Sequence, residues 1–211
     1  MGVIRRGILG GFAGKVANVV GSSWKGIATL KSLPLSVANP NTAGQVTQRG
    51  KMSSIVAFAK QILVAVIKPL NDRFASGMSG FNLFVQRNID LFDGFAITTP
   101  NQFILSTGNV TPVENLDAEG DVSNGTAVVT WDDNTGSGNA LGGDIAYAIL
   151  HDPNTGLVTS FSGATRTSGT LTIDLPESAQ AGDLFNLWLS FRRADGTQVS
   201  NSAYFQTPII A

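Results

Sequence analysis

The spacing of the apolar residues changes near residue 94, and this change restricts the fold more than any other feature. Between Ile55 and Ile89, apolar residues recur at intervals of three and four, which is the period of helices. Beyond residue 94, apolar and polar residues alternate, which is the period of strands with one buried face. The sequence therefore predicts an α+β fold in which the helices precede the strands.

The C-terminal part, residues 96–211, predicts an antiparallel β-sandwich. Its alternating segments are separated by turn-forming clusters of Asp, Asn, Pro and Gly at residues 132–136, 152–156 and 194–196. We expect half-buried strands. Their inward residues would be Val129, Trp131, Ile145, Tyr147, Ile149, Leu171, Ile173, Leu175, Phe185, Leu187, Leu189 and Phe191.

Residues 39–95 predict a helical hairpin. After a chain break, Thr42 and Gln45 form a capping-box pattern at the start of a helix that we expect to end near Pro69. A second helix is expected to follow as far as residue 91 and to pack antiparallel to the first. The first helix is apolar around most of its circumference, which predicts that it is covered on several sides. Two of its residues, Phe58 and Ile62, are therefore candidate subunit contacts.

Residues 1–38 form a glycine-rich basic arm with an extended β pattern. Two short β segments, residues 15–22 and 26–33, flank a turn at Trp24-Lys25-Gly26. An isolated two-stranded hairpin is only marginally stable in water, so the arm needs support from its own helices or from another subunit. The candidate subunit contacts of the arm are Phe12, Lys15, Trp24 and Lys25.

Charge is divided by position along the chain. Residues 1–95 contain eleven Lys or Arg and three Asp or Glu, whereas residues 96–211 contain three and twelve. The basic half could stack on the acidic half of a neighbour or bind a polyanion, or the two halves could face each other within one molecule. Candidate polyanion contacts are Arg5, Arg6, Arg49 and Lys51.

Residue types used in covalent and phosphate chemistry are scarce. The chain has no cysteine, which excludes disulfides, thiolate metal sites and cysteine nucleophiles. The sequence Gly11-Phe12-Ala13-Gly14-Lys15 is only part of a phosphate-binding loop, because Leu9 and Val16 stand where that motif needs glycine and a hydroxyl residue. A tight-turn role for these glycines is the favoured interpretation.

Catalytic and metal-binding patterns are also missing. The single histidine, His151, is expected at a strand end where the chain meets solvent, because no nucleophile elbow accompanies it. Asp132, Asp133 and Asn134 lack the further acidic ligands of a calcium loop and predict a turn. We therefore expect no catalytic, cofactor-binding or metal-binding residues and a protein that is not an enzyme.

The C-terminal part resembles fibronectin type III and related immunoglobulin-like domains over roughly residues 100–208. The resemblance rests on Trp131 at the end of an early strand, Tyr147 in the next long strand, and Leu175-Pro176 before the strand that starts near Phe185. Phe185 stands where such domains often have a corner tyrosine, so the usual hydroxyl bond is missing there. The resemblance implies an immunoglobulin-like sandwich.

A second resemblance, to an uncharacterised protein family of Bacteroidota, covers about residues 7–92. It rests on GGFAGKV at residues 10–16, GSSWKG at residues 21–26, NTAGQ at residues 41–45 with Arg49, and Phe81-Asn82 with Asn88. It implies no activity, because the family is uncharacterised.

The most apolar stretch, residues 55–70, contains Lys60 and Lys68, which argues against a membrane span. Arg5 and Arg6 with the apolar run behind them mimic a secretory signal, but the glycines in that run weaken it. We therefore expect a virion or cytoplasmic location in preference to secretion.

These features together favour a non-enzymatic structural subunit of a repeating assembly, such as a virion shell, a tail component or a filament. Its partners would be other copies of the chain or other structural subunits. One alternative is a surface- or ligand-binding module that presents the sandwich loops at residues 132–143 and 163–169. A second is a nucleic-acid-packaging protein that uses the basic arm.

Overall fold

The computed structural model describes residues 3–4, 12–36, 41–93 and 96–211 of the chain. The chain divides into two compact units, Met1–Ala43 and Gly44–Ala211. The second unit contains both the helices and the large sheet, and residues of both belong to one hydrophobic core.

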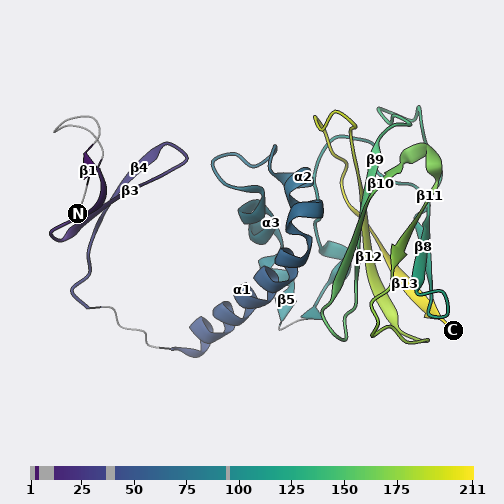
Figure 1. Ribbon diagram of the computed structural model, residues 1–211, viewed down its shortest axis with the longest axis horizontal. Helices are drawn as coiled ribbons and strands as arrows, with labels where there is room; N and C mark the ends of the chain where they lie inside the picture. Colours follow the sequence, from purple (N-terminus) through teal and green to yellow (C-terminus); the bar gives the residue numbers. More distant parts are fainter. Residues whose placement is uncertain (1–2, 5–11, 37–40, 94–95) are drawn as a thin grey trace. The chain divides into compact units, whose positions relative to one another are not determined.

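The first unit is a small antiparallel sheet in the order β1-β2-β3-β4 (Figure 1). Trp24 pairs with Ile27, which leaves Lys25 and Gly26 as a two-residue turn. Both turn residues have positive φ, 46° and 85°, as a type I′ hairpin turn requires. The expected arm turn is therefore present, but four strands form where the sequence predicted two. The strands are β1 Val3–Ile4, β2 Phe12–Val16, β3 Val19–Trp24 and β4 Ile27–Ser32.

The second unit begins with a long continuous helix. It consists of α1 Ala43–Ile62, a π-helical segment Leu63–Ile67 and α2 Lys68–Asn71. The start directly after Thr42 agrees with the capping-box pattern. By length and composition alone this helix could cross a membrane, a property that it shares with the core helices of soluble proteins.

The second helix is shorter than the sequence predicted. α3 spans Gly80–Asn88 and continues as a 3₁₀ turn, Ile89–Leu91, while residues 72–79 form turns and bends. Ser79 caps the helix by accepting a hydrogen bond from the Asn82 N–H at 3.2 Å. The Asp72 carboxylate accepts another from the Gly80 N–H at 2.8 Å. These local bonds stabilise a later start, because they satisfy N–H groups that an uncapped helix end leaves free.

The large sheet has seven strands in the order β10-β9-β12-β13-β7-β8-β11. It is mixed, because β13 runs parallel to β7, and it closes almost into a barrel. The expected purely antiparallel sandwich is therefore corrected: a long-range parallel pair joins its two halves. The strands are β7 Asp117–Asp121, β8 Thr126–Thr130, β9 Ile145–His151, β10 Val158–Thr165, β11 Thr170–Asp174, β12 Leu184–Arg192 and β13 Ala203–Ile210. A two-stranded ribbon, β5 Phe92–Asp93 and β6 Ala96–Ile97, links the helices to this sheet.

Two hydrophobic cores lie on opposite sides of β9 and β12. Inside the barrel, Val129, Trp131, Leu171 and Ile173 pack against the inward residues of β12, which are Phe185, Leu187, Leu189 and Phe191 as the alternation predicted. For β9 the predicted face was wrong, because Ala146, Ala148 and Leu150 face the barrel interior, whereas Tyr147 and Ile149 belong to the core on the helix side. On the other side, the helices pack against the outer face of the same strands, and Figure 1 shows them covering it. The two strands are therefore buried on both faces, whereas the sequence predicted one buried face.

Two buried asparagines attach the helices to the segment that leads into the sheet. The Asn88 amide donates to the Ile104 carbonyl at 2.9 Å and accepts from the Ile104 N–H at 2.8 Å. The Asn71 amide donates to the Leu105 carbonyl at 3.1 Å. Asn88 thus bonds both backbone groups of Ile104, as a neighbouring strand would, and Asn71 adds a single bond to Leu105, so the helices are held in one register on this segment.

Candidate assembly surfaces

The strand register of the first unit assigns its side chains to two faces. Opposite residues share a face, and neighbours along a strand alternate. The first, named here the basic face, contains Ala13, Lys15, Val20, Ser22, Trp24, Ile27, Thr29 and Lys31. The second, named here the apolar face, contains Phe12, Gly14, Val16, Val19, Gly21, Ser23, Ala28, Leu30 and Ser32.

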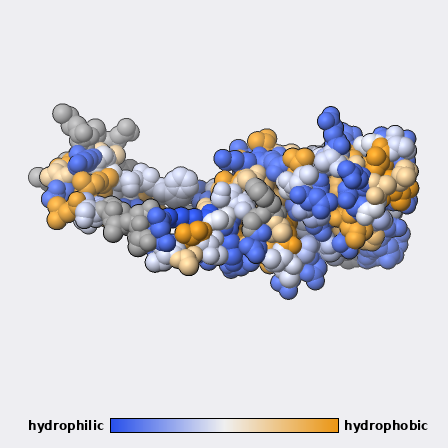
Figure 2. Space-filling view, turned by 90° about the horizontal axis from the view of Figure 1, so that it is seen from below, coloured by the Kyte–Doolittle hydropathy of each residue, from blue (hydrophilic) through white to orange (hydrophobic). Residues whose placement is uncertain are grey.

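Neither face is covered within the described part of this unit. Among its described residues only Gly21 is buried. Trp24, Ile27 and Leu30 are 58%, 60% and 67% exposed, and Figure 2 shows apolar side chains on the surface of this unit. A stable sheet normally buries one face in a core, so this sheet leaves large apolar side chains available for a partner.

Close packing between β2 and β3 explains two of the glycines. A Cβ on Gly21 would lie 2.1 Å from the Phe12 carbonyl oxygen and 2.8 Å from its ring. Gly14 pairs with Gly21 and has φ of 101°, a conformation that favours glycine. Gly14 and Lys15 therefore belong to a strand, which supports a structural role for the glycines over a phosphate-binding one; Gly11 lies outside the described residues.

The first unit is also entirely cationic in its charged residues. Residues 1–43 contain five Lys or Arg and no Asp or Glu. Lys15 and Lys31 flank Val20 across the three strands β2, β3 and β4, because Val20 pairs with both. Lys25 lies in the hairpin turn, while the predicted polyanion contacts Arg5 and Arg6 lie outside the described residues.

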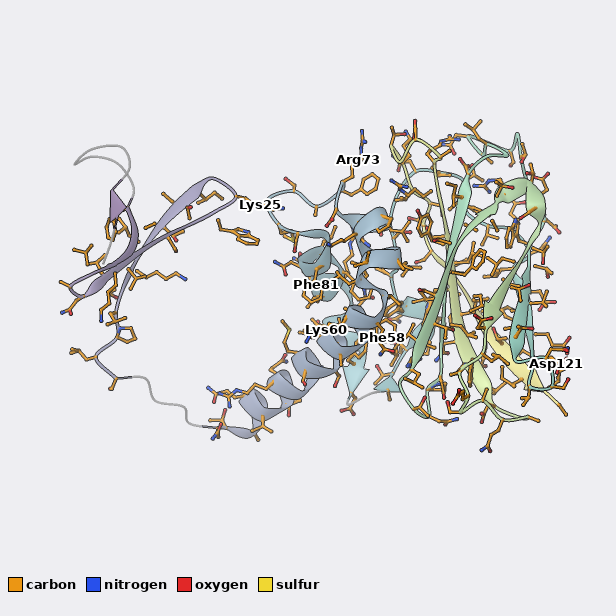
Figure 3. All side chains as sticks on the ribbon, viewed as in Figure 1. Lys25, Phe58, Lys60, Arg73, Phe81 and Asp121 are labelled. Carbon is orange, nitrogen blue, oxygen red and sulfur yellow. The ribbon has the colours of Figure 1, made fainter. Side chains whose placement is uncertain are left out.

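The outer face of strands β7, β8 and β11 has the opposite charge. This surface, named here the acidic face, contains Asp117, Glu119, Asp121, Thr126, Val128, Thr130, Thr170, Thr172 and Asp174. It carries no basic residue, and in the described part of the chain the only ion pairs are those of Asp144 with Arg166 and Arg193. Asp121 marks this face in Figure 3, on the side of the sandwich away from the helices.

The sequence reasoning did not identify the acidic face. Its signal was available, since Asp117, Glu119 and Asp121 occupy every second position of one short segment. That signal was weak because alternate residues Ala118 and Gly120 are small and do not mark a strand strongly. Pairing with β8 and β11 brings in the fourth carboxylate, Asp174, from fifty residues further along the chain.

The other predicted contact residues divide into interior and surface positions. Phe58 and Ile62 lie in the helix-side core, where they are 4% and 0% exposed, so packing within the chain accounts for both (Figure 3). Arg49 lies on the opposite side of α1 and, with Met52, lines a shallow surface depression. Lys51 is half-buried on the same helix.

The two sandwich loops of the binding-module alternative contact each other. Arg166 belongs to the loop at residues 163–169, is fully buried, and contacts the loop at residues 132–143. Its guanidinium forms an ion pair with Asp144 at 3.2 Å and donates to the Asn134 side chain at 2.5 Å. The ring of Phe191 lies 3.9 Å from the guanidinium carbon, which adds a cation–π contact. These contacts join the two loops through one buried guanidinium.

The loop at Asp132, Asp133 and Asn134, where the sequence predicted a turn, is stabilised by its own side chains. The Asp133 carboxylate accepts from the Thr135 N–H at 3.1 Å and from the Thr135 hydroxyl. Asn134 donates to the Pro112 carbonyl at 3.1 Å. Across the residues that the structure describes, no three His, Asp or Glu side chains gather closely enough to hold a metal ion.

His151 ends β9 as expected, but it is fully buried and does not meet solvent. Its ring lies 5.5 Å from the ring of Phe58 and 6.2 Å from that of Trp188, so α1 covers it. Burial lowers the pKa of His151 to about 4, against an opposing effect of the Asp152 carboxylate. Nδ1 lies 3.3 Å from the Asn186 amide nitrogen, which fits a neutral ring that accepts there.

A sequence profile for a family of unknown function, DUF6266, matches residues 11–206. The chain belongs to this family. The match confirms the resemblance to an uncharacterised family and extends it from the N-terminal segments through the sandwich. A comparison with curated proteins finds no match.

Among solved structures, the chain is similar to the crystal structure of an Fn3-like protein from Clostridium thermocellum. The identity is 22%, and the alignment covers 48% of this chain and 94% of that one, with a TM-score of 0.32. The likeness is distant and concerns the fold alone.

Proposed function

We propose that the protein is a non-enzymatic structural subunit of a repeating assembly, such as a virion shell, tail or filament, and that its N-terminal sheet binds neighbouring subunits. The observation that carries this proposal is the absence of a core in the first unit: of its described residues only Gly21 is buried. Conformational entropy opposes the ordering of any such segment, so a partner surface must supply the missing burial.

The second unit also supports this proposal, because no described residue of the arm belongs to its cores. It has two cores of its own and requires nothing from the arm to be buried. Identical subunits can join through such arms, since the body has its own cores and the arm of one copy can bind the surface of the next. The arm and the body carry opposite net charges, which favours contact between copies.

Light scattering at several concentrations and salt levels tests this proposal. We expect the full chain to form concentration-dependent oligomers and the variant that starts at Gly44 to remain monomeric. A full-length Trp24→Ser/Leu30→Ser variant keeps the linker and the charge, and it should also lose assembly. A full chain that stays monomeric at every concentration, with its N-terminal strands protected from hydrogen exchange, would refute the proposal.

A second candidate is a binding module at the loop end of the sandwich. Two observations favour it. The buried Arg166 links the loops at residues 132–143 and 163–169, and Leu141 in the first of these loops is 56% exposed. A bound partner would remove this exposed apolar side chain from water, which favours a contact there. Binding of the wild type to a glycan array, lost in Leu141→Ser, would support it; equal binding by both would exclude this loop as the anchor.

A further inference from the structure

We propose that the basic face of the N-terminal sheet docks on the acidic face of the sandwich in a second copy of this chain. This inference rests on the proposed assembly function and adds to it the two surfaces that meet. Charge, spacing and the size of the two faces support it.

The charges of the two faces are complementary and are not neutralised within the described parts of either unit. The basic face carries Lys15 and Lys31, and no acidic residue occurs anywhere in residues 1–43. The acidic face carries four carboxylates and no cation. Such juxtaposed like charges repel one another in each isolated unit, and contact between the faces would relieve both repulsions.

The spacing of the charged groups also matches. Lys15 and Lys31 lie on the two strands that flank Val20, so two strand separations, about 10 Å, lie between their backbones. Asp121 and Asp174 flank Thr126 in the same way, because Thr126 pairs with both. One row of each face therefore presents two charges at the same separation.

Apolar residues lie beside the charges on both faces. Val128 is 45% exposed in the middle of the acidic face, between Glu119 and Thr172. On the basic face the exposed pair Trp24 and Ile27 lies at the hairpin end. Two sheet faces that pack about 10 Å apart would bring these side chains into contact and remove them from water.

The faces are small, so a single contact between them would be weak, whereas many such contacts in one assembly would be stable together. Each face comprises three strands about five residues long, which is roughly 15 Å by 17 Å. This is smaller than the patch that a stable pairwise complex buries on each partner. Every copy has one face of each kind, so each can donate one arm and accept another, which generates rings or filaments.

The length of the linker favours docking between copies over docking within one. Ten residues, 33–42, join β4 to α1, and they span at most about 36 Å when fully extended. The helices cover one side of the barrel and the acidic face lies on the other, so the chain would have to pass around both sheet layers. Two layers at about 10 Å each and the thickness of the docked arm already use most of that length.

Charge reversal tests the proposal in the full-length protein. Lys15→Glu/Lys31→Glu reverses the basic face, and Glu119→Lys/Asp174→Lys reverses the acidic face; Asp121 is left unchanged because its carboxylate holds the β7–β8 turn. We expect each variant alone to need at least a tenfold higher concentration to oligomerise. An equimolar mixture of the two should oligomerise again, because each arm then finds an opposite charge on the other chain.

The absence of cysteine allows a second test that does not depend on charge. Val20→Cys in one chain and Val128→Cys in another should form a mixed disulfide dimer under mild oxidation. Val16→Cys is the matched control, since Val16 lies on the apolar face of the same sheet and should not cross-link to Val128→Cys. Equal cross-linking of Val16→Cys and Val20→Cys would refute the assignment of the face.

The outcomes separate this inference from the proposed function. If the variant starting at Gly44 fails to assemble but both charge-reversed variants assemble like the wild type, the docking inference is wrong and the assembly function stands. If no form of the chain oligomerises, both are wrong.

Recovery only when all four substitutions are in one chain would show docking within a molecule. Loss of duplex DNA binding with Lys15→Glu/Lys31→Glu, while oligomers persist, would assign the basic face to a polyanion; either result overturns the inference.

Discussion

At the scale of residues, buried polar side chains hold the second unit in register. Asn88, Asn71 and Arg166 each satisfy several backbone or side-chain groups in places where no strand or helix supplies a partner. A buried polar group costs free energy unless it is hydrogen-bonded, so these residues specify which surfaces meet as well as stabilise the contact.

Replacement of Asn88 by alanine should lower the free energy of unfolding by about 1–3 kcal/mol, because it leaves the Ile104 N–H and carbonyl without their partner. Urea unfolding of the variant that starts at Gly44 measures the change. Asn82→Ala on the exposed side of the same helix is the control and should change stability by less than about 0.5 kcal/mol. Equal effects of the two substitutions would contradict a special role for Asn88.

The buried histidine predicts a pH dependence of stability. The pKa of His151 is about 4 in the folded protein and 6.5 for the unperturbed group, so between these values the unfolded chain binds more protons. Stability is therefore complete above pH 6.5 and falls as the pH drops toward 4, by up to about 3 kcal/mol. Urea unfolding at several pH values measures this slope, which His151→Phe should remove because phenylalanine does not titrate. A slope that persists in His151→Phe would assign it to other groups.

The carboxylates act at lower pH. Burial tends to raise the pKa of Asp152, but hydrogen bonds from Thr155, Asn154 and Ser178 lower it overall. The stability that these bonds contribute is present above the ordinary pKa of an aspartate and is lost as the pH falls further. The histidine window therefore lies above the carboxylate window, and the two can be measured separately.

At the scale of elements, α1 is the helix that connects the helical segment to the large sheet of the second unit. Phe58 of α1 lies 5.6 Å from the ring of Phe92, 5.4 Å from that of Phe103 and 5.5 Å from that of His151. The Gln61 amide adds a polar contact, accepting from the Val158 N–H at 3.0 Å and donating to the Gly156 carbonyl at 3.2 Å. The helix thus binds both the connecting ribbon and the edge of the sheet.

Phe58→Ala should destabilise the second unit by about 3–5 kcal/mol, because it removes the centre of this aromatic cluster and leaves a cavity. The measurement is the midpoint of urea unfolding in the variant that starts at Gly44. Met52→Ala, on the exposed side of α1, should leave the midpoint nearly unchanged. A small effect of Phe58→Ala would mean that α1 is not essential for the fold of the sandwich.

At the scale of the whole molecule, the chain combines one self-sufficient body with one segment whose described residues form no core. Residues 44–211 hold all fifteen acidic residues and nine of the fourteen basic ones, a net charge of −6, while residues 1–43 carry +5. The body is held together by burial on both sides of β9 and β12, whereas only Gly21 is buried among the arm residues that the structure describes. We therefore expect the burial of the arm, but not the folding of the body, to depend on protein concentration.

The body should unfold in a single transition, since its two cores share strands β9 and β12. Trp131 belongs to the barrel core and Trp188 to the helix-side core, so each reports on one of them. In the variant that starts at Gly44, fluorescence of Trp131→Phe and of Trp188→Phe follows the two cores separately. Within each variant, this fluorescence and far-ultraviolet circular dichroism should give the same midpoint. Separate midpoints would show that the helices unfold independently of the sandwich.

Local patterns in the sequence determined the strands of this protein, one hairpin turn and the start of its long helix. The alternation of Leu171 with Ile173 and of Phe185 with Leu187 fixes the inward face of each strand, because side chains along a strand alternate whatever its partner is. Lys25-Gly26 sets the hairpin turn, because its backbone conformation is a local property. The start of α1 after Thr42 was likewise predictable from a local capping pattern.

Only the tertiary structure decided which surfaces are covered. His151 becomes buried because Phe58 of α1 packs on it, and Trp188 because Phe103 does. β13 pairs in parallel with β7 across more than eighty residues of chain. The acidic face exists because β11 brings Asp174 beside strands far from it in sequence. These features depend on long-range contacts whose free energy no local pattern of residues encodes, which is why the sequence alone predicted the strands but not their neighbours.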